Sequence, residues 1–65
     1  MNILVNEEAR AVTAGTLAGL VEELGFSDAR IATAIDGEFI PKSARRQYVL
    51  AEGMRVEIVA PMQGG

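Results

Sequence analysis

Alternation between apolar and polar side chains over residues 1–6 predicts a strand, with Ile3 and Val5 on its buried face. The polar residues 6–8 follow and predict a short hairpin loop. Residues 9–13 then predict the returning strand of the hairpin, which the pair Ala14-Gly15 ends. The amino-terminal third of the chain is therefore expected to form a β-hairpin.

A helical pattern follows the first hairpin. Thr16 suits an N-cap, because its hydroxyl can accept a hydrogen bond from one of the first free N–H groups of a helix. Gly25 stands where a left-handed C-cap residue belongs. A helix of about nine residues is too short to be stable alone, so its apolar stripe must pack on a sheet. The stripe has the spacing i, i+3, i+4, i+7 and consists of Leu17, Leu20, Val21 and Leu24.

A second hairpin is predicted in the middle of the chain. Residues 27–29 form a turn, and residues 31–35 are compatible with a strand. The pair Asp36-Gly37 is the strongest short hairpin signal, because a type I′ turn needs a positive φ at both central positions. Residues 38–40 should pair back, and Pro41 ends that pairing because it cannot donate to a ladder.

The last third of the chain predicts one further strand. Residues 42–47 are polar and are compatible with one solvated helical turn, and Glu52-Gly53 indicates another turn. Residues 54–60 alternate again, with Val56 and Ile58 facing inward.

This order of elements predicts a two-layer α+β domain with one main helix packed on one face of a sheet. A final strand beside the first would make the sheet mixed, which is the β-grasp arrangement. We expect residues 1–61 to form this single domain and residues 62–65 to form a flexible C-terminal Gly-Gly tail.

Composition narrows the classes of function. The 65-residue chain has no Cys and no His, which argues against a self-contained enzyme and predicts no metal site. Six Lys and Arg against nine Asp and Glu give a net charge of -3, which argues against binding to nucleic acid. The start of the chain lacks the pattern of a signal peptide, and no apolar run is long enough to span a membrane, so we expect a cytoplasmic protein.

The sequence ends in Met62-Gln63-Gly64-Gly65. Two residues without Cβ atoms give a thin, extended approach, which a carboxylate needs if it is to enter a narrow active site. The alternative is an inert frayed end.

The chain resembles the ubiquitin-like sulfur carrier proteins, most closely those of thiamine biosynthesis (the ThiS family), over essentially its whole length. The family often has a Trp shortly after its Pro-basic pair, where this chain has Ala44-Arg45-Arg46. The residues that carry the resemblance are Met1–Asn6, Gly15–Leu17, Ile35–Lys42, Val56–Val59 and the terminal Gly64-Gly65.

The resemblance implies a carrier rather than a catalyst. An E1-like adenylyltransferase would use ATP and Mg to adenylate the carboxylate of Gly65, while Gly64, Gln63 and Met62 enter its active site. Sulfur supplied through a cysteine desulfurase would convert the carboxylate to a thiocarboxylate. A thiazole synthase would then take that sulfur. The carrier itself would bind no cofactor.

Two surface features bear on partners. Leu4 and Val59 are predicted on the face opposite the core, where they would form one exposed apolar spot for partner docking if the first and last strands are neighbours. Lys42, Arg45 and Arg46 form a small basic cluster, for which a solvated turn is the favoured interpretation and contact with an acidic partner the alternative.

Three other functions fit the same pattern. The chain could carry sulfur for the molybdenum cofactor, although such carriers are usually longer. A ubiquitin-like protein modifier would use the activated glycine to acylate a lysine. A plain interaction module would have no use for the tail.

Overall fold

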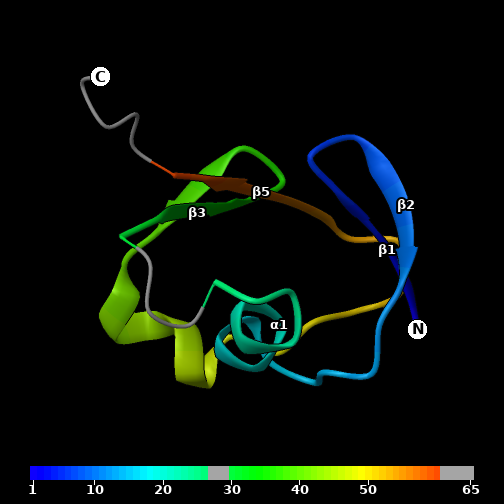
Figure 1. Cartoon of the computed structure of the whole chain (residues 1–65), viewed down its shortest axis with the longest axis horizontal. Helices are drawn as coiled ribbons and strands as arrows, with labels where there is room; N and C mark the ends of the chain where they lie inside the picture. Colours follow the sequence, from blue (N-terminus) through cyan, green and yellow to red (C-terminus); the bar gives the residue numbers. More distant parts are fainter. Residues whose placement is uncertain (27–29, 61–65) are drawn as a thin grey trace.

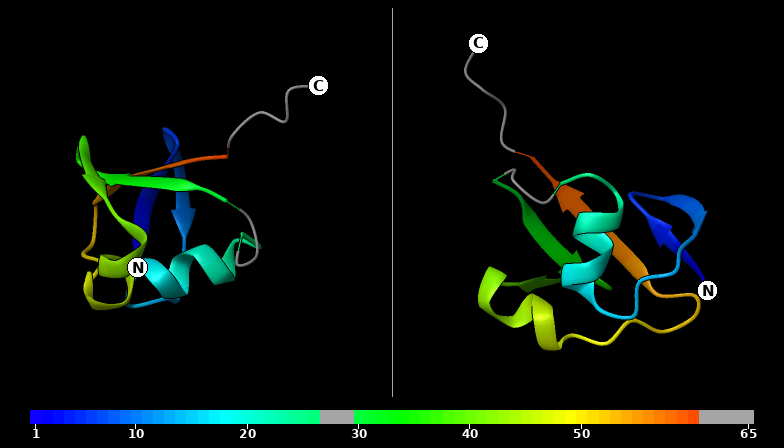
Figure 2. Two further views of the ribbon diagram at one scale, coloured as in Figure 1. Left: turned by 90° about the vertical axis from the view of Figure 1, so that its left-hand side faces the viewer. Right: turned by 60° about the horizontal axis from the view of Figure 1, so that its bottom comes forward.

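A computed structural model describes residues 1–26 and 30–60. Its strands form one curved sheet, and helix α1 and the 3-10 helix η1 lie on the same face of it (Figure 1). The two further views show the same two layers, with the opposite face of the sheet open in the described part of the chain (Figure 2). The elements are β1 (Asn2–Val5), β2 (Glu8–Ala11), α1 (Leu17–Glu23), β3 (Ala32–Ile35), β4 (Glu38–Ile40), η1 (Lys42–Gln47) and β5 (Arg55–Val59).

The sheet is mixed and has the strand order β2-β1-β5-β3-β4. β1 pairs with β2 antiparallel and with β5 parallel, while β3 pairs antiparallel with both β4 and β5. The last strand therefore lies in the middle of the sheet, beside the first. This arrangement confirms the predicted β-grasp fold. The predicted turn at 27–29 lies outside the described residues.

Both predicted hairpin turns use positive φ angles. Asn6 and Glu7 have φ of 50° and 72°, and Asp36 and Gly37 have φ of 49° and 86°. Positive φ at two successive residues is the requirement of a type I′ turn, which matches the twist of the flanking strands. The first loop is consequently two residues long, one shorter than the sequence predicted, and β2 begins at Glu8.

Asn6 also joins the first strand to the last. Its side-chain Oδ1 accepts a hydrogen bond from the Ile58 N–H at 2.8 Å, and its Nδ2 donates to the Ile58 carbonyl at 3.0 Å. These two bonds continue the parallel contact between β1 and β5 beyond the end of β1. They help to fix the level of β5 against β1.

Helix α1 is capped as its sequence predicts. The Oγ1 of Thr16 accepts a hydrogen bond from the Gly19 N–H at 3.1 Å. Gly25 has a φ of +88°, and its N–H donates to the Glu22 carbonyl at 3.0 Å. A left-handed residue at this place satisfies carbonyls that the helix would otherwise leave free.

A carboxylate ties the last turn of α1 to the segment that leads into the helix. Glu23 accepts hydrogen bonds from the backbone N–H groups of Thr13 and Ala14 and from the Thr13 hydroxyl, at 2.9–3.2 Å. The bond from the Thr13 N–H is the main cause that lowers the pKa of Glu23 below its ordinary value of 4.5. These bonds favour the charged form of Glu23 and hold the segment between β2 and α1 against the end of the helix.

The core lies between the sheet and α1. Leu17, Leu20 and Val56 have no exposed surface, and the inward positions predicted for β1 and β5 are all buried. The described helices are too short and too polar to cross a membrane. The buried core consists of Ile3, Val5, Val12, Leu17, Leu20, Ile35, Ile40, Leu50, Val56 and Ile58.

Candidate functional site

The predicted reactive end of the chain, residues 62–65, lies outside the described residues. The structure does describe the strand that leads to it. β5 is hydrogen-bonded to a strand on each side, and its Val56 and Ile58 are buried at 0% and 4% exposure. The segment before the Gly-Gly pair therefore starts at Val59, which pairs with Ala32 of β3.

The two residues predicted to form one docking spot lie on the same open face but do not adjoin. In the parallel pair β1–β5, Leu4 is level with Arg55. Val59 is four residues further along β5, about 13 Å away at the usual rise of a strand. The first and last strands are neighbours, as the prediction required, but their register separates the two side chains.

Val59 instead lies in a different apolar surface. It pairs with Ala32 of β3. Ala34, which is also on β3, pairs with Phe39 of β4. Val59 and Phe39 are 61% and 63% exposed. We call Val59, Ala32, Ala34 and Phe39 the open-face patch. The sequence did not single out Phe39, and its place on this face follows from its pairing with Ala34.

Leu4 has other neighbours on that face. It pairs with Ala9 of β2 on one side and with Arg55 of β5 on the other, and it is only half-buried. Arg55 in turn forms an ion pair with Glu7, whose carboxylate lies 3.8 Å from its Nε. Leu4 is therefore separated from the open-face patch by charged positions of β5.

The prediction of a solvated basic turn at 42–47 is wrong for Arg45. This side chain is only 8% exposed. Its Nε donates to the hydroxyl of Thr33 at 3.0 Å, and its Nη2 donates to the carbonyl of Ile31 at 2.8 Å. Arg45 therefore fastens η1 to β3, whereas Arg46 and Lys42 are exposed as predicted.

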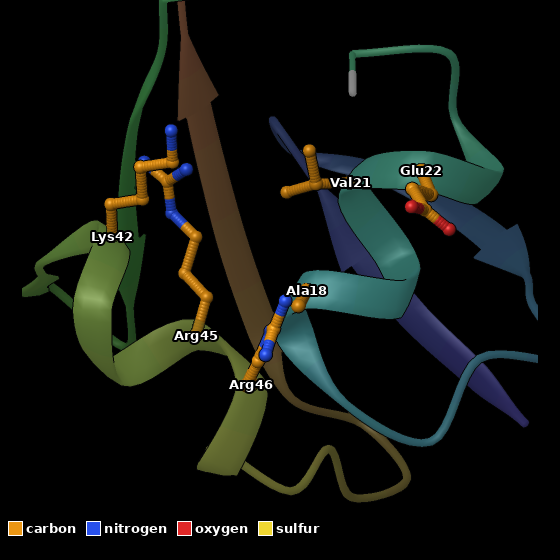
Figure 3. Close-up of a pocket in the computed structure, with 6 residues that line it drawn as sticks. All are labelled: Ala18, Val21, Glu22, Lys42, Arg45 and Arg46. Atoms are coloured by element: carbon orange, nitrogen blue, oxygen red, sulfur yellow. The ribbon is translucent and has the colours of Figure 1, made fainter. Parts of the chain in front are cut away.

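A groove lies between α1 and η1, on the covered side of the sheet (Figure 3). Its volume is about 240 Å³. The sticks of Lys42, Arg45 and Arg46 all rise from η1, and Glu22 lies across from them on the helix (Figure 3). The lining residues are Ala18, Val21, Glu22, Lys42, Arg45 and Arg46.

Glu22 and Glu23 do not form a paired-carboxylate site. Glu23 is engaged with the segment before the helix, and Glu22 borders the groove. Across residues 1–26 and 30–60, no three Asp or Glu side chains gather in a way that could hold a metal ion.

Comparisons with known proteins agree with this geometry. The pattern that defines the ThiS family matches residues 3–65. A thiazole synthase from Paramagnetospirillum magneticum is 35% identical over 66 residues, which cover the whole of this chain but only 20% of that protein. The chain thus spans about a fifth of the length of this curated relative.

Two solved structures of a thiamine biosynthesis protein (ThiS) from Geobacter metallireducens share the fold. The crystal structure has a TM-score of 0.82 at 26% identity and covers all of both chains. The solution structure also has a TM-score of 0.82, at 23% identity, and covers all of this chain and 88% of the other. The family that the sequence motifs predicted is confirmed, and the chain belongs to the ThiS family.

Proposed function

We propose that this protein is the sulfur carrier of thiamine biosynthesis, with Gly65 as the residue that carries sulfur. The observation that supports this most directly is the family match over residues 3–65, because it includes Gly64 and Gly65 as well as the β-grasp domain. The carrier would work in the cytoplasm.

The proposed chemistry activates the carboxylate of Gly65 in two stages. An E1-like adenylyltransferase binds ATP and Mg, and the carboxylate oxygen attacks the α-phosphorus, so that pyrophosphate leaves. The sulfur of a persulfide, supplied through a cysteine desulfurase, then attacks the acyl carbon and AMP leaves. A thiol then attacks the other sulfur of the resulting S–S bond and forms a disulfide with it, which releases the sulfur on Gly65 as a thiocarboxylate.

The carrier would contribute a handle rather than catalytic groups. With no Cys and no His, the chain lacks the usual nucleophile and the usual proton-transfer group near neutral pH. Adenylation, sulfur transfer and ring formation would all take place in the partners. The metal and the nucleotide would likewise be held by the activating enzyme.

A thiazole synthase is the proposed acceptor of the sulfur. A segment similar to this whole chain occurs within a protein that is itself named thiazole synthase. Carrier and synthase sequences that occur in one polypeptide support the view that the two work together.

The docking surface follows from the reach of the tail. Gly65 is six residues beyond Val59, so an extended segment places its carboxylate within about 20 Å of Val59. A partner that receives Gly65 must therefore approach this end of β5, where Val59 and Phe39 are exposed. We propose that the activating enzyme docks on the open-face patch and also contacts Leu4, which lies on the same face outside the patch.

The test is the intact mass of the chain after incubation with a thiamine-pathway activating enzyme, MgATP, a cysteine desulfurase and cysteine. We expect the mass increase of one oxygen replaced by sulfur. A chain without Gly65 is the matched control and should show neither this change nor ATP–pyrophosphate exchange. Exchange that persists without Gly65 would refute the proposal, and covalent conjugates would indicate a protein modifier instead.

Docking is tested separately with Val59→Glu. This exposed substitution should preserve folding and raise the KM of the carrier in ATP–pyrophosphate exchange. Ala11→Glu, at an exposed position of the edge strand β2, is the control for the one negative charge that Val59→Glu adds. Equal effects of the two substitutions would contradict docking on the open-face patch.

A further inference from the structure

The groove between α1 and η1 is strongly positive in a protein that is negative as a whole. Its lining holds three cations and one carboxylate, a net charge of +2, whereas the whole chain has a net charge of -3. Half of the six Lys and Arg residues of the chain lie here. Such a concentration of charge in a concave site attracts anions.

The buried member of this group has no counter-ion among the described residues. Arg45 donates its two hydrogen bonds to neutral oxygens, those of Thr33 and Ile31. The one ion pair in the described part of the chain joins Arg55 to Glu7. A buried cation is costly unless an anion compensates its charge, and no described residue supplies that anion to Arg45.

The exposed members leave their donors available. Lys42 and Arg46 make no side-chain hydrogen bond to another described residue, and they stand on either side of Arg45 in the sequence of η1. Ala18 and Val21 line the same groove with apolar surface. The groove therefore offers charged donors beside a surface that suits methylene groups.

We propose that this groove binds a Glu or Asp side chain of a partner protein, as part of an acidic segment. The carboxylate would lie among Lys42, Arg45 and Arg46, and its methylene groups would contact Ala18 and Val21. Charge complementarity favours this occupant. The groove, at about 240 Å³, is smaller than most sites for drug-sized ligands but can hold such a side chain.

This surface is separate from the proposed docking patch. The groove is on the side of the sheet covered by α1 and η1, whereas Val59 and Phe39 are on the open side. The inference therefore does not rest on the sulfur-carrier proposal. It assigns a contact with a partner to Lys42, Arg45 and Arg46, for which the sequence favoured a solvated turn.

The experiment is an NMR titration of the whole chain with a hexaglutamate peptide at low salt, with hexaglutamine as the neutral peptide. We expect saturable shifts confined to α1 and η1. The double variant Lys42→Glu/Arg46→Glu should weaken binding at least about tenfold. The matched control Arg10→Glu/Arg55→Glu changes the net charge equally, at exposed positions of β2 and β5 that do not line the groove, and should weaken it less than about threefold.

Two single variants sharpen the result. Glu22→Gln removes the carboxylate that lines the groove and should strengthen peptide binding. Asp28, in the segment before β3 that lies outside the described residues, is tested in the same way. If Asp28→Asn strengthens binding more than tenfold, the chain supplies its own anion to the groove and the proposal is overturned.

Three other outcomes would also overturn it. Equal losses in the two charge-reversal variants would mean general attraction between a cationic surface and the peptide. Tighter binding of inorganic phosphate than of hexaglutamate would indicate a small-anion site. Binding of hexaglutamine as strong as that of hexaglutamate would exclude carboxylate recognition.

Discussion

Replacing Arg45 by Ala should destabilise this domain far more than the same change at its neighbour Arg46. The two residues have the same charge and adjoin in η1, so a polar turn in solvent would treat them alike. In the structure only Arg45 is buried, at 8% exposure, and only Arg45 is hydrogen-bonded to β3.

The magnitude follows from what Arg45 contributes. Hydrogen bonds to a charged group are each worth about 1.5–3 kcal/mol. Relief from burying the cation offsets part of the loss of two such bonds, and loss of the buried side-chain stem adds to it. We expect Arg45→Ala to lower the free energy of unfolding by about 2–4 kcal/mol, and Arg46→Ala to change it by less than about 0.5 kcal/mol.

This loss is large for so small a protein. A 65-residue domain has a total stability of only about 3–10 kcal/mol. In thermal unfolding, each kcal/mol corresponds to about 4–8 °C for a domain of this size, so the Tm of Arg45→Ala should fall by about 8–32 °C. Arg45→Met keeps most of the stem and should lose less than Ala.

Urea unfolding followed by far-ultraviolet circular dichroism measures these differences. The comparison is valid if the two alanine variants keep the m-value of the parent. Equal midpoints for Arg45→Ala and Arg46→Ala would refute the reasoning, because they would mean that the guanidinium of Arg45 is solvated.

The other predictions concern the helix and the two faces of β1. Thr16→Ala removes the N-cap bond of α1 and should cost about 1 kcal/mol in urea unfolding, whereas Thr16→Ser should restore most of it. Because the pKa of Glu23 is lowered, its charged form stabilises the fold at pH values above 4.5, the ordinary pKa, and stability should fall as the pH decreases below that value. Glu23→Gln should flatten this part of a pH–stability curve. An unchanged slope would contradict the role of the bonds from Thr13 to Glu23. Leu4→Glu on the open face should leave the domain folded and weaken activation modestly, while Val5→Glu, at 6% exposure, should unfold it; equal destabilisation of the two would show that the faces of β1 are assigned incorrectly.

Local patterns account for most of the fold that the sequence predicted. The Asp36-Gly37 turn, the Thr16 cap and the Gly25 end of the helix depend on residues close together in the chain, and all three are confirmed. The alternation that placed Val56 and Ile58 inward is equally local, because side chains on a strand alternate with a period of two.

Long-range register was beyond the reach of these patterns. Alternation assigns Leu4 and Val59 to one face but does not say at which level of the sheet each lies. The level depends on contacts such as those of Asn6 with Ile58, which are 52 residues apart in the sequence. Leu4 and Val59, predicted to form one apolar spot, therefore lie at two separate places on the open face.

The burial of Arg45 was hidden for a related reason. Every residue near it in η1 is polar or small, and nothing in that segment indicates a buried position. Its partner is the hydroxyl of Thr33, a residue of β3 buried at 1% exposure, whose own hydroxyl donates to the Ile40 carbonyl at 2.8 Å. Only the packing of η1 against the second hairpin reveals that a polar pair lies within the apolar layer.

The position of β5 in the middle of the sheet explains how so small a domain can present two separate surfaces. The outward residue Val59, at the end of β5, pairs with Ala32 of β3 and remains exposed on the open face. The inward residues of the same strand complete the core on which α1 and η1 pack, and the charged groove forms where these two helices meet. The sheet itself therefore separates an apolar surface near the proposed reactive tail from a cationic surface behind it, and a partner on one side leaves the other accessible.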